Sequence, residues 1–437
     1  MSADRFHLAW FLQGSSIQAW GEPWTGNISE DWMVPSLFLD LARSIERACF
    51  DYMLIEDSIY IGQNWKNSRE LFLRTGMAVP RQEPSVVATL MAGATSRLGI
   101  VPTLSTFAYA PYLTARIVGT LDQVSSGRAG WNVVTGSSDL SAQNFGMDRL
   151  PDHDVRYAMA EEYVDIVKRL WGSWDPGAIV ADRVTGTLID HEKVHTIDYE
   201  GKYYRCRGPL NSGPCPQGRP VIAQAGGSAV GRAFAARNAD TIVAAPTGIE
   251  AMKQYRADVR ARLVEAGRDP DSCKVLFLFS PIVAETEEEA RWHADQRTAT
   301  AARDVDVKLA RLGWVTNIDF SGHELDAPIG ELSTNGHQST LEHFLRSSGK
   351  KTLREAIIAY GSKGYCVDVV GTPDSVASQM AEIMQEVGGD GFLFSLPNVS
   401  RRAIATITDG LIPVLQQRGL VRKAYEHTQL RDNLLEF

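Results

Sequence analysis

Cysteine is scarce in this sequence. Five occur among 437 residues, at positions 49, 206, 215, 273 and 366, and no two of them have a C-x-x-C spacing. A small, odd set without that spacing is typical of reduced thiols rather than of a disulfide framework. We therefore expect a cytoplasmic protein.

Long apolar runs and basic stripes are also missing. No apolar run approaches the ~20 residues that span a bilayer, and residues 1–7 lack the apolar core of a signal peptide. The formal net charge is −9 and no run of Lys or Arg appears, whereas nucleic-acid and anionic-membrane surfaces need basic patches. The sequence thus predicts no nucleic-acid or membrane partner and leaves small molecules as ligands.

What is present is a repeated alternation of two kinds of segment. Short apolar runs predict buried strands, and helical periodicity, often opened by a proline, follows most of them. Thr286 and Glu289 also have the spacing of a capping box at a helix start. The predicted strands cover 8–12, 52–57, 98–106, 131–135, 220–225, 241–245, 275–284 and 391–396, and the clearest helices cover 35–48, 84–95, 111–124, 157–171, 229–239, 249–266 and 404–417.

Eight buried strands alternating with helices predict an α/β fold, a parallel (β/α)8 TIM barrel. A doubly wound open sheet is the rival, but residues 13–16 after the first strand contain one glycine instead of G-x-G-x-x-G. We expect a single barrel domain over 1–437, with insertions at about 172–219 and 300–350 and a C-terminal tail over 420–437.

In such a barrel the active site lies at the carboxyl ends of the strands. This rule gathers a set of polar side chains, each of which, taken singly, also fits a helix cap or a turn: Asp57, Thr103, Ser105, Asn132, Thr135 and Gln224.

Two segments are candidates for binding an anion at this end. Gly226 and Gly227 separate a strand from a helix and leave N–H groups available for a monophosphate, while Ser228 fits a helix N-cap equally well. His153, Arg156 and Tyr157 stand near a helix start. They fit either ligands of the same anion or a solvated helix entry.

One motif points elsewhere. Residues 191–195 satisfy H-E-x-x-H, the pattern of zinc peptidases. Zinc binding needs both imidazoles on one face of a helix, whereas Gly186 before the motif and residues 196–201 after it are typical of turns and strands. We predict no metal site.

Several segments, in order, resemble one family: residues 126–135, 144–146, 153–157, 224–228, 413–419 and 430–433. They are similar to the flavin-dependent monooxygenases typified by nitrilotriacetate monooxygenase and dibenzothiophene sulfone monooxygenase, a branch of the bacterial-luciferase-like superfamily. The resemblance implies a luciferase-like barrel that takes reduced FMN from a separate NAD(P)H-dependent flavin reductase. With O2 and a C4a-hydroperoxyflavin it would oxygenate a small organic substrate, such as an organosulfur or aminopolycarboxylate compound. It also implies a homo-oligomer.

Position by position, the resemblance assigns FMN-contacting roles to Asp57, Thr103, Asn132, His153, Tyr157, Gly227 and Ser228. His153, Tyr157 and Ser228 would hold the phosphate end, and Asp57, Thr103 and Asn132 would lie nearer the ring system. No catalytic residue is assigned.

Flavin oxygen chemistry requires exclusion of water, so we expect residues 13–32, 58–83 and 300–350 to form a lid and the substrate pocket. The second of these segments offers cations for an anionic substrate: Lys66, Arg69, Arg74 and Arg81. Three alternatives stay open, namely a deazaflavin-dependent dehydrogenase on the same barrel, a flavin-binding protein without catalysis, and the zinc hydrolase of the H-E-x-x-H motif.

Overall fold

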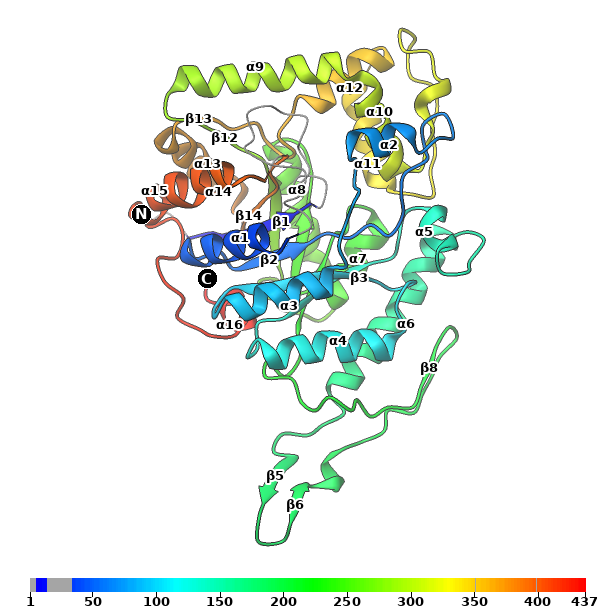
Figure 1. The fold of residues 1–437 in the computed structure, drawn as a ribbon, viewed down its shortest axis with the longest axis vertical. Coiled ribbons are helices and arrows are strands. Elements are labelled where there is room, and N and C mark those ends of the chain that lie inside the picture. Colours follow the sequence, from blue (N-terminus) through cyan, green and yellow to red (C-terminus); the bar gives the residue numbers. More distant parts are fainter. Residues whose placement is uncertain (1–4, 14–33, 350, 398) are drawn as a thin grey trace.

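Eight parallel strands close into a barrel (Figure 1). The computed structural model describes residues 5–13, 34–349, 351–397 and 399–437. Going round the barrel, the order is β1, β2, β3, β4, β9, β10, β11 and β14, and β14 pairs with β1. Their bounds are His7–Leu12, Tyr52–Ile55, Gly99–Ser105, Gly130–Val134, Val221–Gln224, Thr241–Ala244, Lys274–Phe279 and Gly391–Phe394. The predicted barrel and its eight strands are confirmed.

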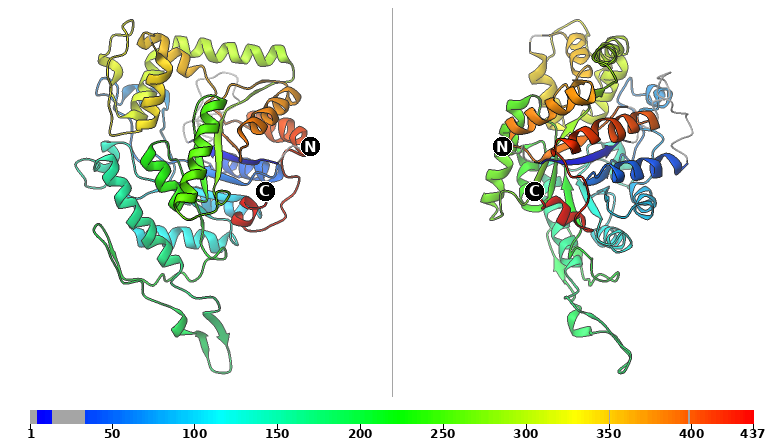
Figure 2. Two further views of the ribbon diagram at one scale, coloured as in Figure 1. Left: turned by 180° about the vertical axis from the view of Figure 1, so that it is seen from behind. Right: turned by 90° about the vertical axis from the view of Figure 1, so that its left-hand side faces the viewer.

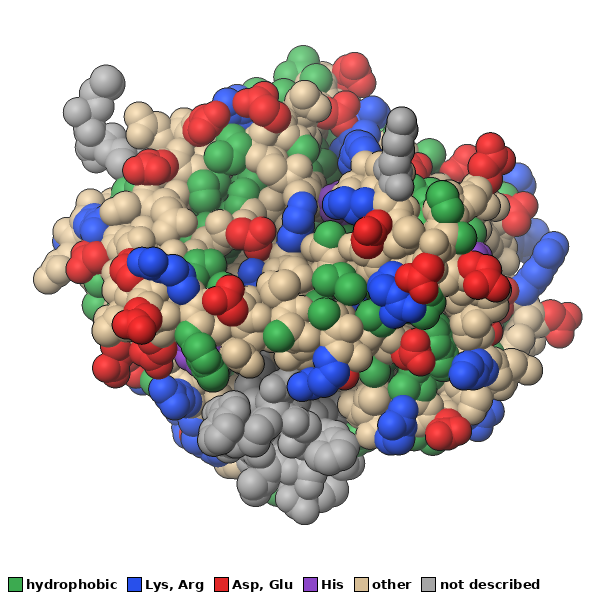
Figure 3. Space-filling model, turned by 90° about the horizontal axis from the view of Figure 1, so that it is seen from above, with side chains coloured by type: hydrophobic (Ala, Val, Ile, Leu, Met, Phe, Trp, Pro, Cys, Tyr) green, Lys and Arg blue, Asp and Glu red, His purple; other side chains and the backbone are tan. Residues whose placement is uncertain are grey.

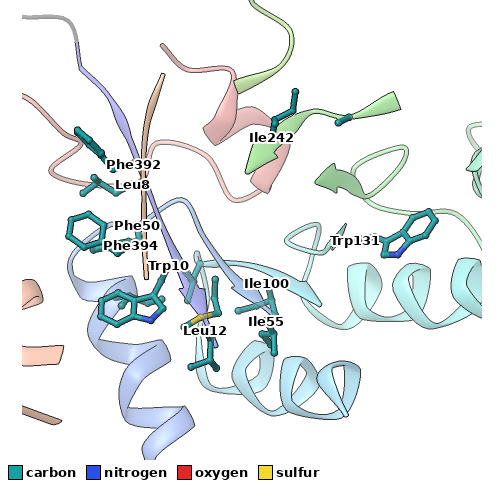
Figure 4. Packing of buried hydrophobic residues seen from close by; sticks show 14 of the residues in the cluster. Leu8, Trp10, Leu12, Phe50, Ile55, Ile100, Trp131, Ile242, Phe392 and Phe394 are labelled. Carbon is teal, nitrogen blue, oxygen red and sulfur yellow. The ribbon is translucent and has the colours of Figure 1, made fainter. Parts of the chain in front are cut away.

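Helices surround this barrel, and outward-facing strand side chains pack against them. Figure 4 shows Trp10 and Phe394, from neighbouring strands, together with Phe50. Their ring centroids lie 5.5–6.4 Å apart, which is within the range of favourable aromatic pairs. The helices are α1 (Ser36–Arg47), α3 (Pro84–Ala94), α4 (Pro111–Val124), α6 (His153–Trp171), α7 (Ala229–Asn238), α8 (Ile249–Glu265), α13 (Pro373–Val387), α14 (Arg401–Ala405), the π-helical turn η5 (Thr406–Leu411) and α15 (Ile412–Gln417).

The barrel interior is apolar at its amino-terminal end. Leu430 and Leu434 of α16 (Leu430–Leu434) pack with inward-facing strand residues such as Leu54 and Val101. A Cβ on Gly99, at the start of β3, would lie 2.5 Å from Leu430 Cδ1. The 420–437 segment therefore closes the end of the barrel opposite the strand carboxyl ends.

The turn before β4 matches its sequence. Ser126 and Gly127 both have positive φ, at 58° and 88°, and this left-handed geometry reverses the chain within a few residues. Gly130 faces the interior, where a Cβ would lie 2.9 Å from Val101 Cγ2. The small residues before Trp131 are therefore required by the turn and by the packed barrel.

The 172–219 segment contains two antiparallel hairpins, β5 (Ile179–Asp182) with β6 (Thr187–Ile189), and β7 (Tyr199–Glu200) with β8 (Arg205–Cys206). The β5–β6 hairpin projects away from the barrel in Figure 1 and in both views of Figure 2. Val184, near its tip, is 96% exposed.

The H-E-x-x-H motif lies beside this hairpin. Residues His191–Lys193 form a single 3-10 turn, and His195 Nε2 lies 2.8 Å from Asp175 Oδ2. The helix that a zinc peptidase motif requires does not form there.

The chain between β11 and β14 adds helices above the barrel mouth: α9 (Glu287–Arg303), α10 (Val305–Thr316), the 3-10 turn η4 (Phe320–Gly322), α11 (Gln338–Ser348) and α12 (Leu353–Gly361). They share a second hydrophobic core with the segment that follows β2, in which Trp65 and Phe72 pack near Leu309 and Phe344. That segment contains α2 (Glu70–Thr75). We call residues 287–361 the helical insertion.

Some predicted boundaries are wrong. β11 ends at Phe279, five residues early, and β12 (Ile282–Val283) pairs instead with β13 (Val370–Gly371). α6 begins at His153, four residues before the predicted start. At α9, Thr286 accepts from Glu289 N, but the Glu289 carboxylate accepts from Glu285 N, so only half of a capping box forms.

Two further findings concern membrane-spanning helices and the state of the cysteines. Among the helices of the described residues, none combines the length and apolarity that crossing a bilayer requires. All five cysteines lie in the described ranges, and each is a free thiol.

Candidate functional site

A cavity of about 2150 Å³ lies between the carboxyl ends of the strands and the helical insertion. Typical ligand pockets are about 300–1,000 Å³, so two ligands fit side by side. Seen from above in Figure 3, the face over this region carries acidic and basic side chains interspersed. The cavity is lined by all the residues predicted to contact FMN: Asp57, Thr103, Asn132, His153, Tyr157, Gly227 and Ser228.

The pairing of β3 with β4 sets Thr103 opposite Asn132. Both side chains point into the barrel, and Asn132 Nδ2 donates to Thr103 Oγ1 over 2.8 Å. Asn132 Oδ1, Ser105 Oγ and Gln224 Oε1 are buried without a hydrogen-bond partner among the described residues. Buried polar atoms in native proteins are almost always satisfied, so these atoms are available to a ligand: the Asn132 and Gln224 oxygens as acceptors, and the Ser105 hydroxyl as donor or acceptor.

Asp57 lies two residues beyond the end of β2 and also lines the cavity. Burial raises the pKa of its carboxyl to about 6, although the nearby Arg81 guanidinium opposes the shift. Ser58 N donates to Asp57 Oδ1 over 2.7 Å. Asp57 is therefore a group that changes charge near neutral pH inside the cavity.

The cations predicted for an anionic substrate divide into two groups. Lys66 and Arg74 line the cavity. Arg81 is buried, with Nη1 3.3 Å from Glu56 Oε2, and Arg69 is the N-cap residue of α2. Only the first pair faces the space where a substrate fits.

The turn of Gly226, Gly227 and Ser228 joins β9 to α7. Ser228 is the N-cap, and its Oγ accepts from Gly231 N over 3.0 Å. The carbonyls of Gly226 and Gly227 accept from the Tyr255 hydroxyl and the Arg232 guanidinium. In the ranges that the structure describes, the N–H groups of Gly227 and Ser228 donate to no protein atom.

The same turn requires a glycine at position 226, because a side chain there would clash with its neighbours. A Cβ on Gly226 would lie 2.5 Å from Gln224 Oε1 and 2.7 Å from Gly231 O, closer than real Cβ atoms approach. The turn therefore exposes two N–H groups at the positive end of a helix, which is the arrangement that binds an anion.

Two α6 side chains converge on this turn. His153 Nε2 lies 3.4 Å from Ser228 Oγ, and Gln224 Nε2 donates to Tyr157 OH over 3.4 Å. Burial raises the pKa of Tyr157, so its phenol stays protonated and available as a donor. His153 and Tyr157 can bind the same anion as the turn.

The sequence makes Arg156 a candidate ligand of the same anion, but its terminal nitrogens bind elsewhere. Its Nη1 donates to Pro151 O and Asn335 Oδ1 over 2.6 and 3.2 Å, and its Nη2 donates to Asn335 O over 2.9 Å. Both terminal nitrogens thus bind backbone and the helical insertion, and Arg156 fixes that insertion to α6.

The roof of the cavity contains residues that the sequence does not single out as candidate site residues, although most of them lie in the predicted lid segment 300–350. Gly336–Thr340 and His343 line it from the helical insertion, and Tyr365 lines it from the chain that follows. Residues of the predicted lid segments 58–83 and 300–350 do line the cavity. The lid prediction for 13–32 falls almost entirely outside the described residues; Gln13, which is described, donates from Nε2 to Tyr365 OH over 3.1 Å.

Comparisons with known proteins agree with this geometry. Residues 15–391 match the family described as luciferase-like monooxygenase. The N-acetyl-S-(2-succino)cysteine monooxygenase of Bacillus subtilis is 33% identical, over 98% of this chain and 95% of the relative. A dibenzothiophene-sulfone monooxygenase of Rhodococcus erythropolis is also 33% identical, over 98% of this chain and 96% of the relative.

The likeness extends to solved structures. The crystal structure of a riboflavin lyase with modified FMN and its substrate riboflavin has a TM-score of 0.90 and 30% identity, covering 99% of this chain and 96% of that one. The chain belongs to the luciferase-like monooxygenases.

Proposed function

We propose that this chain is the oxygenase of a two-component system, which uses reduced FMN from a separate NAD(P)H-dependent flavin reductase, together with O2, to oxygenate a small organic substrate. The observation that carries this proposal is the anion cradle of Gly227 and Ser228 in the same cavity as the unpartnered Asn132 and Gln224 oxygens. An anion site beside hydrogen-bond acceptors fits a phosphorylated, N–H-bearing cofactor.

The residues present fit FMN at both ends. Gly227, Ser228, His153 and Tyr157 would hold the phosphate through hydrogen bonds and the α7 dipole. Asn132, Thr103 and Asp57 lie on β4, on β3 and after β2, and would hold the ring system. The cavity wall between the two sets is formed by the ends of neighbouring strands.

Reduced FMN supplies the electrons that activate O2, and the chain supplies binding, orientation and protection from water. The roof of the cavity suits this task because it has its own hydrophobic core. Tyr60 OH donates to Trp314 O over 2.9 Å and ties the segment after β2 to α10.

The remaining volume favours an organic substrate beside the cofactor. The relatives act on sulfur compounds by their names, and Lys66 and Arg74 face the cavity, so we propose an organosulfur or aminopolycarboxylate substrate. The five free thiols support a cytoplasmic location. Exposed aliphatic side chains on the projecting hairpin support a homo-oligomer: Ile179, Val180, Val184 and Leu188.

The reaction is tested by supplying chemically reduced FMN and isotopically heavy O2 with dibenzothiophene sulfone, nitrilotriacetate and N-acetyl-S-(2-succino)cysteine as separate substrates. We expect one heavy oxygen atom in the product of at least one compound, measured by mass spectrometry. Turnover without oxygen derived from O2 contradicts the proposal. Substrate oxidation by an oxidised deazaflavin, or substrate reduction by a reduced one, under anaerobic conditions would favour the dehydrogenase alternative instead.

The cofactor site is tested by Ser228→Asp. Asp is as good an N-cap as Ser, so α7 should stay folded, while the added charge repels a phosphate. We expect FMN affinity to fall by at least about tenfold in fluorescence titrations. Thr352→Asp changes the N-cap of α12 at a residue that does not line the cavity, and should leave FMN affinity unchanged.

A further inference from the structure

The anion cradle has a second wall, which comes from the helical insertion. Ser339 lies near the start of α11, and its Cβ is 2.5 Å from the position that a Cβ on Gly227 would take. The absence of a side chain at Gly227 therefore lets Ser339 reach the turn whose N–H groups have no protein partner. Residues 334 to 343 of the insertion cross the barrel mouth at this point.

The start of α11 presents the same chemistry as the start of α7. The N–H groups of Gln338, Ser339 and Thr340 donate to no atom of the described residues, and all three residues line the cavity. The two helices have 11 and 10 residues, long enough for each amino terminus to carry a partial positive charge. Two such ends close to each other carry partial charges of the same sign, which an anion bound beside both of them would offset.

A separate observation points to an organic anion. Gln224 is 3% exposed, and its Oε1 has no partner although it lies beside Gly226. A fully ionised phosphate cannot donate a hydrogen bond to this oxygen, whereas a hydroxyl of a phosphorylated polyhydroxy chain can. The ligand thus combines an anionic group with a hydroxyl next to it.

The insertion is fixed on both sides of this point. Asn335 Oδ1 accepts from His153 N over 3.0 Å, and Arg156 binds the same residue. On the other side, His343 Nε2 lies 3.0 Å from Thr247 Oγ1, in the loop after β10. Ser339 is held between these two attachments, so its position relative to Ser228 is set by the fold.

We infer that the helical insertion supplies half of the phosphate site, with the Ser339 hydroxyl and the N–H groups at the start of α11 binding the phosphate opposite Ser228 and α7. The identity of the ligand as FMN rests on the proposed function. The assignment has a structural consequence, because the phosphate then joins the barrel to its roof.

The test compares FMN with riboflavin, which lacks the phosphate, by fluorescence titration of the full chain. Ser339→Asp places a carboxylate in the first turn of α11, where it favours the helix but repels a phosphate. We expect FMN affinity to fall roughly tenfold or more while riboflavin affinity changes less than about twofold. Ser347→Asp, on the exposed far end of the same helix, should change neither affinity.

Unchanged FMN affinity in a Ser339→Asp protein with the wild-type circular dichroism spectrum overturns the inference. If that variant does not fold, Ser339→Ala takes its place, with an expected selective loss of about threefold or more for FMN, and no selective loss overturns the inference. Ser228→Asp separates the two proposals. Selective loss of FMN in that variant but not at Ser339 leaves the proposed cofactor in place, whereas no selective loss in either variant rejects both.

Discussion

Arg128 should be one of the most stabilising side chains of the barrel. It is 3% exposed and precedes β4 by two residues. Its Nε donates to Ser125 O, its Nη1 to Leu98 O and Thr95 Oγ1, and its Nη2 to Ala92 O and Thr95 O, over 2.7–3.0 Å. The guanidinium thus satisfies carbonyls that the carboxyl end of α3 leaves without helical partners.

The magnitude follows from these contacts. Each hydrogen bond to a charged group contributes about 1.5–3 kcal/mol net, but bonds made by one side chain are not additive. Each buried acceptor left without a donor costs about 1–3 kcal/mol. We therefore expect Arg128→Met to lower the free energy of unfolding by about 4 kcal/mol, and Arg128→Lys by about half as much, because an ammonium cannot reach acceptors on both segments at once.

The measurement is urea denaturation followed by circular dichroism. Arg116→Met is the matched control, because Arg116 is exposed on α4 and surface substitutions change stability by less than about 0.5 kcal/mol. A loss below about 1 kcal/mol in Arg128→Met would show that water or backbone rearrangement replaces the guanidinium, and the reasoning would be refuted.

Two further predictions concern the barrel plug and the cavity. Leu430→Ala should cost about 2–5 kcal/mol of unfolding free energy because Leu430 is buried in the barrel end, whereas Leu435→Ala, at a residue that is 54% exposed, should cost little; equal losses in urea denaturation would contradict the plug. Because the pKa of Asp57 is raised to about 6, the folded chain binds this proton more tightly than the unfolded chain, and wild-type stability should fall as pH rises from about 4 through about 6. Relative to wild type, Asp57→Asn should therefore gain up to about 3 kcal/mol between pH 4 and pH 7.5, and a pH-independent difference would reject the assigned shift.

The barrel is predictable from sequence because its strands are local signals. A strand buried on both faces is a short continuous apolar run, as in Gly391–Phe394, and prolines mark the starts of α3 and α4. The start of α9 is marked by its N-cap residue Thr286, but its length has no apolar signal, because only Ala290 and Ala301 are buried on it. β11 ends early because Pro281 follows it and Ile282 pairs with Val370 instead. That pairing joins segments far apart in the sequence, so local sequence does not reveal it.

In the candidate site, too, some residues are predictable from sequence and others are not. Asn132, Thr103 and Asp57 are predictable because each lies among the last three residues of a strand or two residues beyond its end, and parallel strands of a barrel end together. Ser339 is not, because its place beside Gly227 depends on how a remote insertion folds over the mouth. Arg156 and Tyr157 are adjacent on α6 but have different roles: Arg156 binds Asn335 of the helical insertion, whereas Tyr157 lies beside Gln224 at the anion site. This difference also depends on how the insertion folds.

Because β1 pairs with β14, one edge of the first strand stays unpaired until almost the whole chain has been synthesised. His7 finds its neighbour at Gly391, so the first strand leaves the ribosome with one edge that nothing yet made can cover. At about 5–20 residues per second, that edge stays open for roughly 20–80 s. Unpaired strand edges can pair with other chains and cause aggregation. The yield of soluble protein should therefore depend on temperature and on the supply of chaperones while this edge is open. Substitutions at the cavity do not shorten that time.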